Sequence, residues 1–372
     1  MKIVTIYQSQ SPLSFYNYFF VFIKISGDKV FYLYPMKKIF FAIIFCVLAI
    51  NVYAQQDDVN TLHDNAKAFM RQGDFANATL ILTRAFQQDP QNLGIAKDLA
   101  MTYYLQKENE KALNTIKPFV DNNNADDQAY QLAATFYRAL SNDKEAEKIY
   151  KRAIKEYPKS GGLYNDYGEM LLSKHDPGSI KQWEKGIEMD PSFGNNYYNA
   201  CKYYYYTEFS KSKVWCLLYG EIFINIESFT SRTAEIKDIL LDGYKKFFAE
   251  PDLLKNTKDK NAFEIAFLTC MNKQNDVVIR GINAETLTMI RTRFMLEWNK
   301  NYAEKFPFRL FELQENLLEQ GLFPAYNQWI FGASQNLAAY QSWTSNHSTE
   351  MQGLKDFQSG RIFKVPPGQY YH

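Results

Sequence analysis

The chain has 372 residues, 46% of them hydrophobic, with 42 lysines and arginines against 41 aspartates and glutamates. A chain of this length can bury a core without covalent cross-links, and its four cysteines are too few for a disulfide scaffold. Because its charges balance, it lacks the general attraction for phosphate backbones, and we expect no nucleic-acid partner.

A segment near the start has the layout of a secretory signal peptide. A short basic region, 36–38, precedes a 12-residue apolar core, 39–50, which is short for a membrane-spanning helix. We expect cleavage after Ala54, and a periplasmic or cell-envelope location. Residues 1–35 stand in front of this signal, and we interpret them as an upstream extension, with an extended signal or a membrane anchor as the alternative.

Cleavage would change the charge balance only slightly. Residues 1–54 contain five lysines and one aspartate, so the mature chain has 37 basic and 40 acidic residues and a net charge of −3.

From residue 59 onward, one pattern returns about every 34 residues. Small residues stand where two helices would touch, and larger residues stand where neighbouring hairpins would meet. In the third unit the small residues are Ala134, Ala146 and Ala153, and Pro158 ends the second helix. Such a period is typical of stacked helical hairpins. The expected units are 59–92, 93–126, 127–160, 161–193 and a divergent fifth unit, 194–250.

These units resemble the tetratricopeptide repeat family. The resemblance implies an all-α fold, a right-handed α-α superhelix of helical hairpins, followed here by additional C-terminal helices. It also implies a scaffold that binds a protein or peptide in a concave groove. Together with the signal peptide it favours association with an envelope assembly, and we expect no cofactor.

In the family, the groove is lined by positions 2, 5, 9, 12 and 13 of each first helix. Carried over to this chain, those positions give twelve candidate partner-binding residues: His63, Lys67, Lys97, Met101, Tyr104, Gln131, Arg138, Asn165, Glu169, Tyr198, Lys202 and Tyr205.

The tyrosine-rich segment 197–206 motivates a second hypothesis, a carbohydrate-binding or peptidoglycan-binding envelope protein. Flat aromatic rings can stack on sugars. The competing interpretation is packing, because helical geometry turns Tyr197 and Tyr204 toward the interior.

Beyond the repeats the sequence predicts further helices. We expect helices over 210–226 and through Ile236 to Phe247, then a polar domain boundary at 251–260. Four more helices are expected before an extended, loosely held tail that begins at Gly360. Their expected ranges are 262–271, 284–302, 308–319 and 325–340.

Nothing in the sequence indicates catalysis or a metal site. The four histidines lack metal-ligand spacing, and the C-terminal glutamates have the spacing of solvated helix faces, so we rank an enzyme in residues 252–372 last. Cys201 and Cys216 could face each other across one hairpin. We favour free packed thiols there, with a disulfide as the alternative that export would permit.

Overall fold

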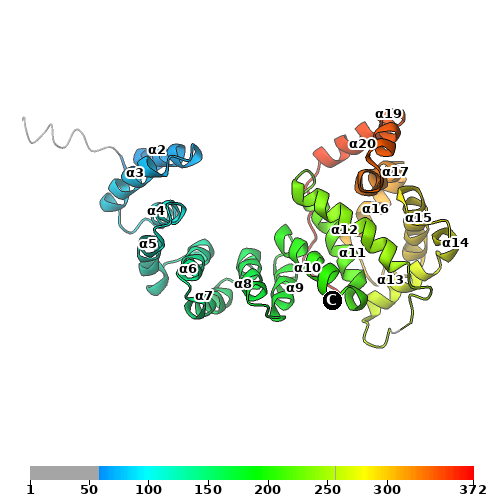
Figure 1. The fold of residues 1–372 in the computed structure, drawn as a ribbon, viewed down its shortest axis with the longest axis horizontal. Coiled ribbons are helices and arrows are strands. Elements are labelled where there is room, and N and C mark those ends of the chain that lie inside the picture. Colours follow the sequence, from blue (N-terminus) through cyan, green and yellow to red (C-terminus); the bar gives the residue numbers. More distant parts are fainter. Residues whose placement is uncertain (1–57, 256) are drawn as a thin grey trace, which may run out of the picture. The chain divides into compact units, whose positions relative to one another are not determined.

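The computed structural model describes residues 58–255 and 257–372, and in these ranges the regular structure is entirely helical (Figure 1). The expected upstream extension, 1–35, and the signal peptide, 36–54, lie outside the described residues. The described chain forms two compact units, one that ends at Ile95 and one that begins at Ala96.

The first unit contains one complete hairpin of α2 (Val59–Arg71) and α3 (Phe75–Gln88). Ala66, Ala78 and Ala85 are fully buried between its helices. A larger side chain at any of these positions would push the two backbones apart.

The helix that begins at Leu93 crosses from the first unit into the second, which contains the remaining hairpins and the C-terminal helices. The elements of residues 93–247 are α4 (Leu93–Leu105), α5 (Asn109–Asp121), α6 (Asp127–Ala139), α7 (Asp143–Glu156), α8 (Gly161–Ser173), α9 (Gly178–Met189), α10 (Gly194–Thr207), α11 (Phe209–Ile226) and α12 (Ser231–Phe247). The elements that follow are α13 (Ala262–Asn272), α14 (Asn275–Val278), α15 (Ala284–Asn301), α16 (Arg309–Glu319), α17 (Phe323–Asn327), η1 (Gln328–Gly332), α18 (Ala333–Gln335), α19 (Leu337–Asn346) and α20 (Ser348–Ser359).

The helix boundaries follow the repeat period. The first helices begin at the first residues of the five expected units: Val59, Leu93, Asp127, Gly161 and Gly194. The small residues expected at helix contacts have no exposed surface, as at Ala134, Ala146 and Ala153. The expected all-α fold of stacked helical hairpins is confirmed.

The turns inside the first four hairpins also repeat, each with a left-handed residue at the same position. Gly73, Lys107, Ser141 and His175 have φ of 77°, 65°, 58° and 56°, and each lies 34 residues after the one before. A residue with a Cβ pays about 1–2 kcal/mol for this conformation, which glycine adopts freely. Of the four turns, only the first has glycine, Gly73, at this left-handed position.

Ser141→Gly should therefore stabilise the chain, by up to about 1 kcal/mol after the greater flexibility of glycine in the unfolded chain is subtracted. Urea unfolding measures the change. Ala139→Gly is the matched control, since it puts glycine at an exposed helical residue and should destabilise. Equal losses in both variants would contradict the argument.

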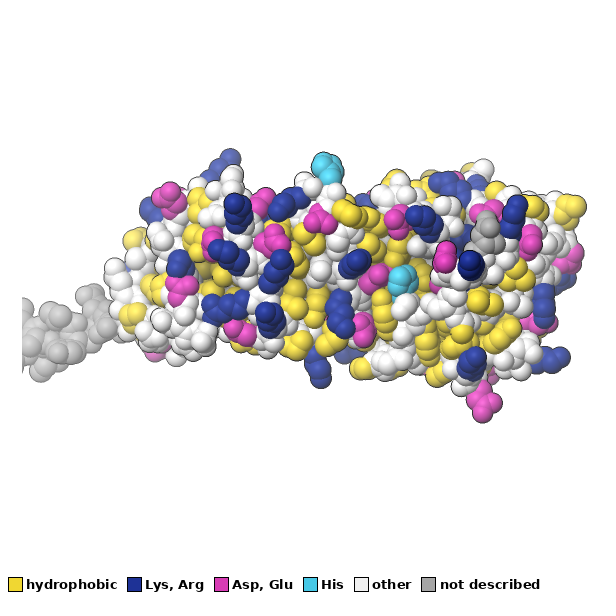
Figure 2. Space-filling model, turned by 90° about the horizontal axis from the view of Figure 1, so that it is seen from below, with side chains coloured by type: hydrophobic (Ala, Val, Ile, Leu, Met, Phe, Trp, Pro, Cys, Tyr) yellow, Lys and Arg dark blue, Asp and Glu magenta, His cyan; other side chains and the backbone are white. Residues whose placement is uncertain are grey.

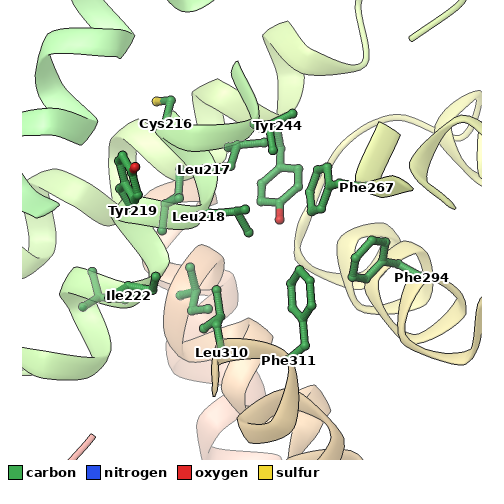
Figure 3. Close-up of a cluster of buried hydrophobic side chains, with 14 of the residues drawn as sticks. Cys216, Leu217, Leu218, Tyr219, Ile222, Tyr244, Phe267, Phe294, Leu310 and Phe311 are labelled. Atoms are coloured by element: carbon green, nitrogen blue, oxygen red, sulfur yellow. The ribbon is translucent and has the colours of Figure 1, made fainter. Parts of the chain in front are cut away.

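The C-terminal helices share one hydrophobic core with the last hairpins. Figure 3 shows side chains from α11, α12, α13, α15 and α16 that converge, among them Leu218, Tyr244, Phe267, Phe294 and Phe311. The buried cluster extends from Ile180 to Val365 and includes Leu253, inside the expected boundary 251–260. Apolar packing thus continues on both sides of that polar segment.

A buried polar network lies behind this core. Glu221 of α11 and Arg291 of α15 form an ion pair with 2% and 1% of their side chains exposed. Gln314 Nε2 and Tyr326 Oη donate to the same Glu221 Oε1, each at 2.9 Å. The four helices α11, α15, α16 and α17 therefore meet at one carboxylate, whose Oε1 accepts three hydrogen bonds.

The expected helix 325–340 is wrong as a single element. The chain forms a π-helical turn at η1 and then leaves the helix at Asn336, whose φ of −163° and ψ of 112° are extended. The Asn336 side chain accepts a hydrogen bond from Ala339 N at 2.9 Å. Asparagine competes in this way for backbone donors, so it starts the new helix α19 and ends the previous one.

The sequence pattern missed α20 and misjudged the tail. Helix α20 buries only Met351 and Leu354, too few residues for a clear period. The tail is extended but not loose: Phe363 and Val365 are buried, and Tyr371 stacks on Phe263 at 4.8 Å. Its contacts come from distant parts of the chain, which local sequence does not reveal.

None of the described helices is both long and apolar enough to cross a membrane.

Candidate functional site

The candidate site is the first-helix surface, which we define as the polar face that α4, α6, α8, α10 and α12 form within residues 96–246. His63 and Lys67 belong to the other compact unit and are described separately. Lys67 Nζ lies 3.9 Å from Asp64 Oδ1, and both His63 and Lys67 are half-buried.

Hydrogen bonds join α4 to α6 and α6 to α8. Lys97 Nζ donates to Asp126 Oδ2 at 2.5 Å and to Gln128 Oε1 at 2.9 Å. Gln131 Nε2 donates to Asp166 Oδ2 at 2.7 Å. Two predicted residues, Lys97 and Gln131, thus hold neighbouring first helices together.

The same arrangement continues from α8 to α10. Asn165 Nδ2 donates to Glu169 Oε1 at 3.1 Å, and Asn199 Nδ2 donates to Asn165 Oδ1 at 2.9 Å and Glu169 Oε1 at 3.2 Å. The predicted pair Asn165 and Glu169 is therefore brought together. Glu169 is exposed and receives only neutral amide donors, so it keeps its charge available at the surface.

Helix α12 was expected from the sequence, but its place as a sixth first helix was not. Tyr198 Oη donates to Glu235 Oε2 at 2.5 Å, and Tyr205 Oη donates to Asp242 Oδ2 at 2.6 Å. Both bonds join residues 37 positions apart. The step exceeds 34 because α11, the preceding second helix, is 18 residues long.

Four other predicted residues lie on the same helices. The Tyr104 ring packs against Phe136 with centroids 5.3 Å apart, and Met101 and Arg138 are half-buried. Lys202 pairs with Glu235 at 2.7 Å.

Asp166 is a groove residue that the sequence analysis missed. Burial raises the pKa of its carboxyl, while hydrogen bonds from Asn165 and Gln131 act in the opposite direction. Asp166 and Asn199 both occupy the sixth position of their first helices. Polar residues at this position in two successive units were the sequence signal that could have placed them in the groove.

Cations cover the tyrosine rings that motivated the glycan hypothesis. Lys202 Nζ and the Arg232 guanidinium lie 4.8 Å and 5.1 Å from the Tyr198 ring centroid. Lys246 Nζ lies 4.1 Å from the Tyr205 centroid. Cations held over an aromatic face compete with a sugar for it, and these contacts weaken that hypothesis.

Apolar side chains lie exposed at the ends of successive first helices. Leu105 and Leu172 each expose 45% of their surface and Tyr206 exposes 66%, and Ala139 is exposed at the matching end of α6. They occupy the twelfth or thirteenth positions of their helices. The polar hydrogen-bonded surface is thus accompanied by one apolar side chain per unit.

Charges of both signs are mixed on the face that Figure 2 shows. Lysines and arginines there are interspersed with acids and apolar patches, without a field of one sign. A nucleic-acid-binding stripe would require basic side chains gathered together, and this face has no such stripe.

The side-chain chemistry is otherwise that of packing. Cys201, Cys216 and Cys270 are buried and free, and Cys216 Sγ lies 3.6 Å from the Cys201 carbonyl oxygen. Within 58–255 and 257–372, no three His, Cys, Asp or Glu side chains form a group that could hold a metal ion.

Lys237 of α12 is a further residue that sequence reasoning passed over. Burial lowers the pKa of its ammonium group to about 7. Its Nζ lies 3.7 Å from the Trp329 ring centroid, a contact that favours the charged form and partly offsets burial. It makes no hydrogen bond or ion pair with another described residue.

The Lys237 pKa predicts a pH-dependent stability. Between pH 7 and 10.5 the unfolded chain binds the proton more tightly than the folded one, so stability should rise with pH across this window. Lys237→Met should raise the free energy of unfolding at pH 7, because it removes a half-buried ammonium group that is partly desolvated, and should raise it less at pH 10. Urea unfolding at both pH values measures this, and an equal gain at both would contradict it.

Two segments of the chain match tetratricopeptide repeat profiles, residues 69–136 and 128–160. Together with the stacked hairpins, these matches define a helical-repeat protein of the kind that acts as an interaction scaffold, a class that is typically non-enzymatic. Residues 69–160 of the chain therefore belong to the tetratricopeptide repeat family.

Several solved structures are similar to parts of the chain. A thermophilic TPR protein from Thermus thermophilus is 14% identical with a TM-score of 0.41, over 50% of this chain and 100% of that one. A tetratricopeptide repeat protein from Parabacteroides merdae is 13% identical with a TM-score of 0.38, over 68% and 96%. The C-terminal part of a TPR repeat-containing protein from Cytophaga hutchinsonii is 14% identical with a TM-score of 0.40, over 66% and 95%. No curated protein sequence matches the chain.

Proposed function

We propose that the protein is an exported scaffold of the bacterial cell envelope, and that it binds a protein or peptide partner along the first-helix surface. The repeats support the scaffold role. The signal-like segment 36–54 supports export to the periplasm.

The observation that carries the proposal is the row of exposed apolar ends beside a pre-ordered polar surface. The side chains of Leu105, Leu172 and Tyr206 are exposed to solvent and are not covered by other side chains of the protein. Hydrogen bonds such as Gln131–Asp166 and Tyr198–Glu235 already order the groups next to them. A partner therefore gains apolar burial without a large ordering cost.

An extended peptide fits this surface best. Its apolar side chains would cover the exposed helix ends, while its backbone amides would reach carboxylates such as Glu169, whose own donors are neutral amides. Because the exposed helix ends are apolar, we expect the partner to be chosen by apolar anchors more than by net charge.

Affinity purification from crosslinked envelope, followed by mass spectrometry, tests the proposal. Leu172→Asp with Tyr206→Asp should reduce recovery of a reproducible partner at least about tenfold, because a carboxylate would be buried in an apolar contact. Leu296→Asp is the matched control: Leu296 is 67% exposed on α15, outside the first-helix surface. Equal recovery with the surface variant and the control would overturn the proposed site.

Export is tested separately. The mature protein in the periplasmic fraction should begin at Gln55, as measured by N-terminal sequencing. An uncleaved protein in the cytoplasmic fraction would contradict export without affecting the scaffold role.

A further inference from the structure

A small cavity lies among η1, α18, α19 and the start of α15, and none of its lining residues belongs to the first-helix surface. Its volume is about 190 Å³, and the side chains that matter for its chemistry are Glu285, Gln328, Gln335, Tyr340 and Trp343. At ~30 Å³ for each water molecule, it has room for a group of about six non-hydrogen atoms.

The cavity wall contains hydrogen-bonding groups that have no partner. Gln328 is 8% exposed, yet its side-chain amide bonds to no described residue. The same holds for the Tyr340 hydroxyl and for the Glu285 carboxylate within the described chain. These groups are open to the cavity, so a bound polar ligand can form hydrogen bonds with them in place of solvent.

The backbone around Gln328 is built to keep this space open. Gln328 and Gly332 belong to the π-helical turn, an arrangement that often marks functional sites. A Cβ on Gly332 would lie 2.5 Å from both Gln328 Oε1 and Tyr340 Cδ2, so only glycine leaves these two side chains in place. Asn336, which interrupts the helix after this turn, starts α19. Helix α19 then brings Tyr340 and Trp343 to the cavity.

We propose that this cavity binds an ammonium or guanidinium group, carried by a lysine or arginine side chain of a partner or by a small free amine. The lining includes one carboxylate, Glu285, and neither lysine nor arginine. Two electron-rich rings, Tyr340 and Trp343, form part of the wall, and His347 fixes the Trp343 ring by stacking at 4.2 Å. Carboxylate, amide oxygen and aromatic faces are the groups that recognise an organic cation.

The oxygen atoms that remain unbonded in the cavity favour a ligand that donates hydrogen bonds. Gln335 Oε1 already accepts from Ala284 N at 2.7 Å, which leaves the acceptors of Gln328 and Glu285 to the ligand. Because Glu285 is exposed, the cation would enter from its side and place its apolar stem against the rings.

Calorimetric titration of the full chain tests the proposal with N-acetyl-arginine amide, N-acetyl-lysine amide and the neutral N-acetyl-citrulline amide. The cations should bind at the cavity and the citrulline compound roughly tenfold more weakly. Glu285→Gln should weaken cation binding about three- to tenfold, and Tyr340→Leu should weaken it as well. Glu350→Gln is the matched control, an exposed acid in the first turn of α20 that should leave binding unchanged.

The source of the cation is resolved by comparing the blocked residues with butylguanidinium and butylammonium. Tighter binding of the blocked residues would assign the cavity to a partner side chain, and equal binding would assign it to a free amine. Binding of the citrulline compound equal to that of the arginine compound, or unchanged affinity in Glu285→Gln, would overturn the proposal. Thermal unfolding of each variant shows whether it is folded, and failure here leaves the first-helix surface unaffected.

Discussion

Arg291→Met should lower the free energy of unfolding by about 3–5 kcal/mol, because it leaves the carboxylate of Glu221 buried without its cation. Gln314 and Tyr326 would still donate to Glu221 Oε1, but neutral donors do not replace a guanidinium in a site that excludes water. Urea unfolding followed by far-ultraviolet circular dichroism measures the loss.

The double variant Glu221→Leu with Arg291→Met separates the ion pair from the general packing. It should recover much of the loss, because no buried charge remains unpaired. Arg309→Gln, which removes an exposed ion pair with Glu312, should change stability little. A loss below about 1 kcal/mol in Arg291→Met would show that the network does not hold the C-terminal helices.

Phe263→Ala should destabilise the protein by about 3–5 kcal/mol, since it removes the ring at the centre of an aromatic cluster. Phe263 lies within 5.5 Å of the ring centroids of Trp215 in α11, Trp298 in α15 and Tyr371 in the tail. The cavity would be lined by large rings that cannot collapse into it. Phe229→Ala, at a side chain 74% exposed, is the control and should have little effect.

The same variant tests the expected domain boundary at 251–260. If the cluster is one cooperative core, helices before and after this segment should lose stability together in hydrogen exchange. Loss of protection only after residue 260 would instead support a separate C-terminal domain.

The repeats could be predicted from sequence because their signal is local. Small residues such as Ala134 and Ala146, and large ones between hairpins, recur at a period set by the length of two helices and two turns. Each of these residues contacts only its own hairpin or the next one, so the pattern survives in the linear sequence. The first-helix surface followed from the same period through the family resemblance, as at Lys97 and Gln131.

What the predicted surface residues contact could not be read in this way. The sequence placed Tyr198 and Tyr205 in the groove, but Glu235 and Asp242, which they bond, stand 37 residues away in a helix outside the repeat pattern. A longer α11 shifted the period, and a strict 34-residue spacing does not find them.

The sequence by itself determined the helical-hairpin fold, the starts of the first helices and the small residues between them, because local periodicity specifies each. Only the tertiary structure decided the arrangement of the C-terminal part. There, Glu221 meets Arg291 across 70 positions, Asn336 breaks an expected helix, and Tyr371 packs on Phe263. These contacts join residues far apart in the chain, and the free energy that selects them comes from burial and pairing that exist only once the helices have packed.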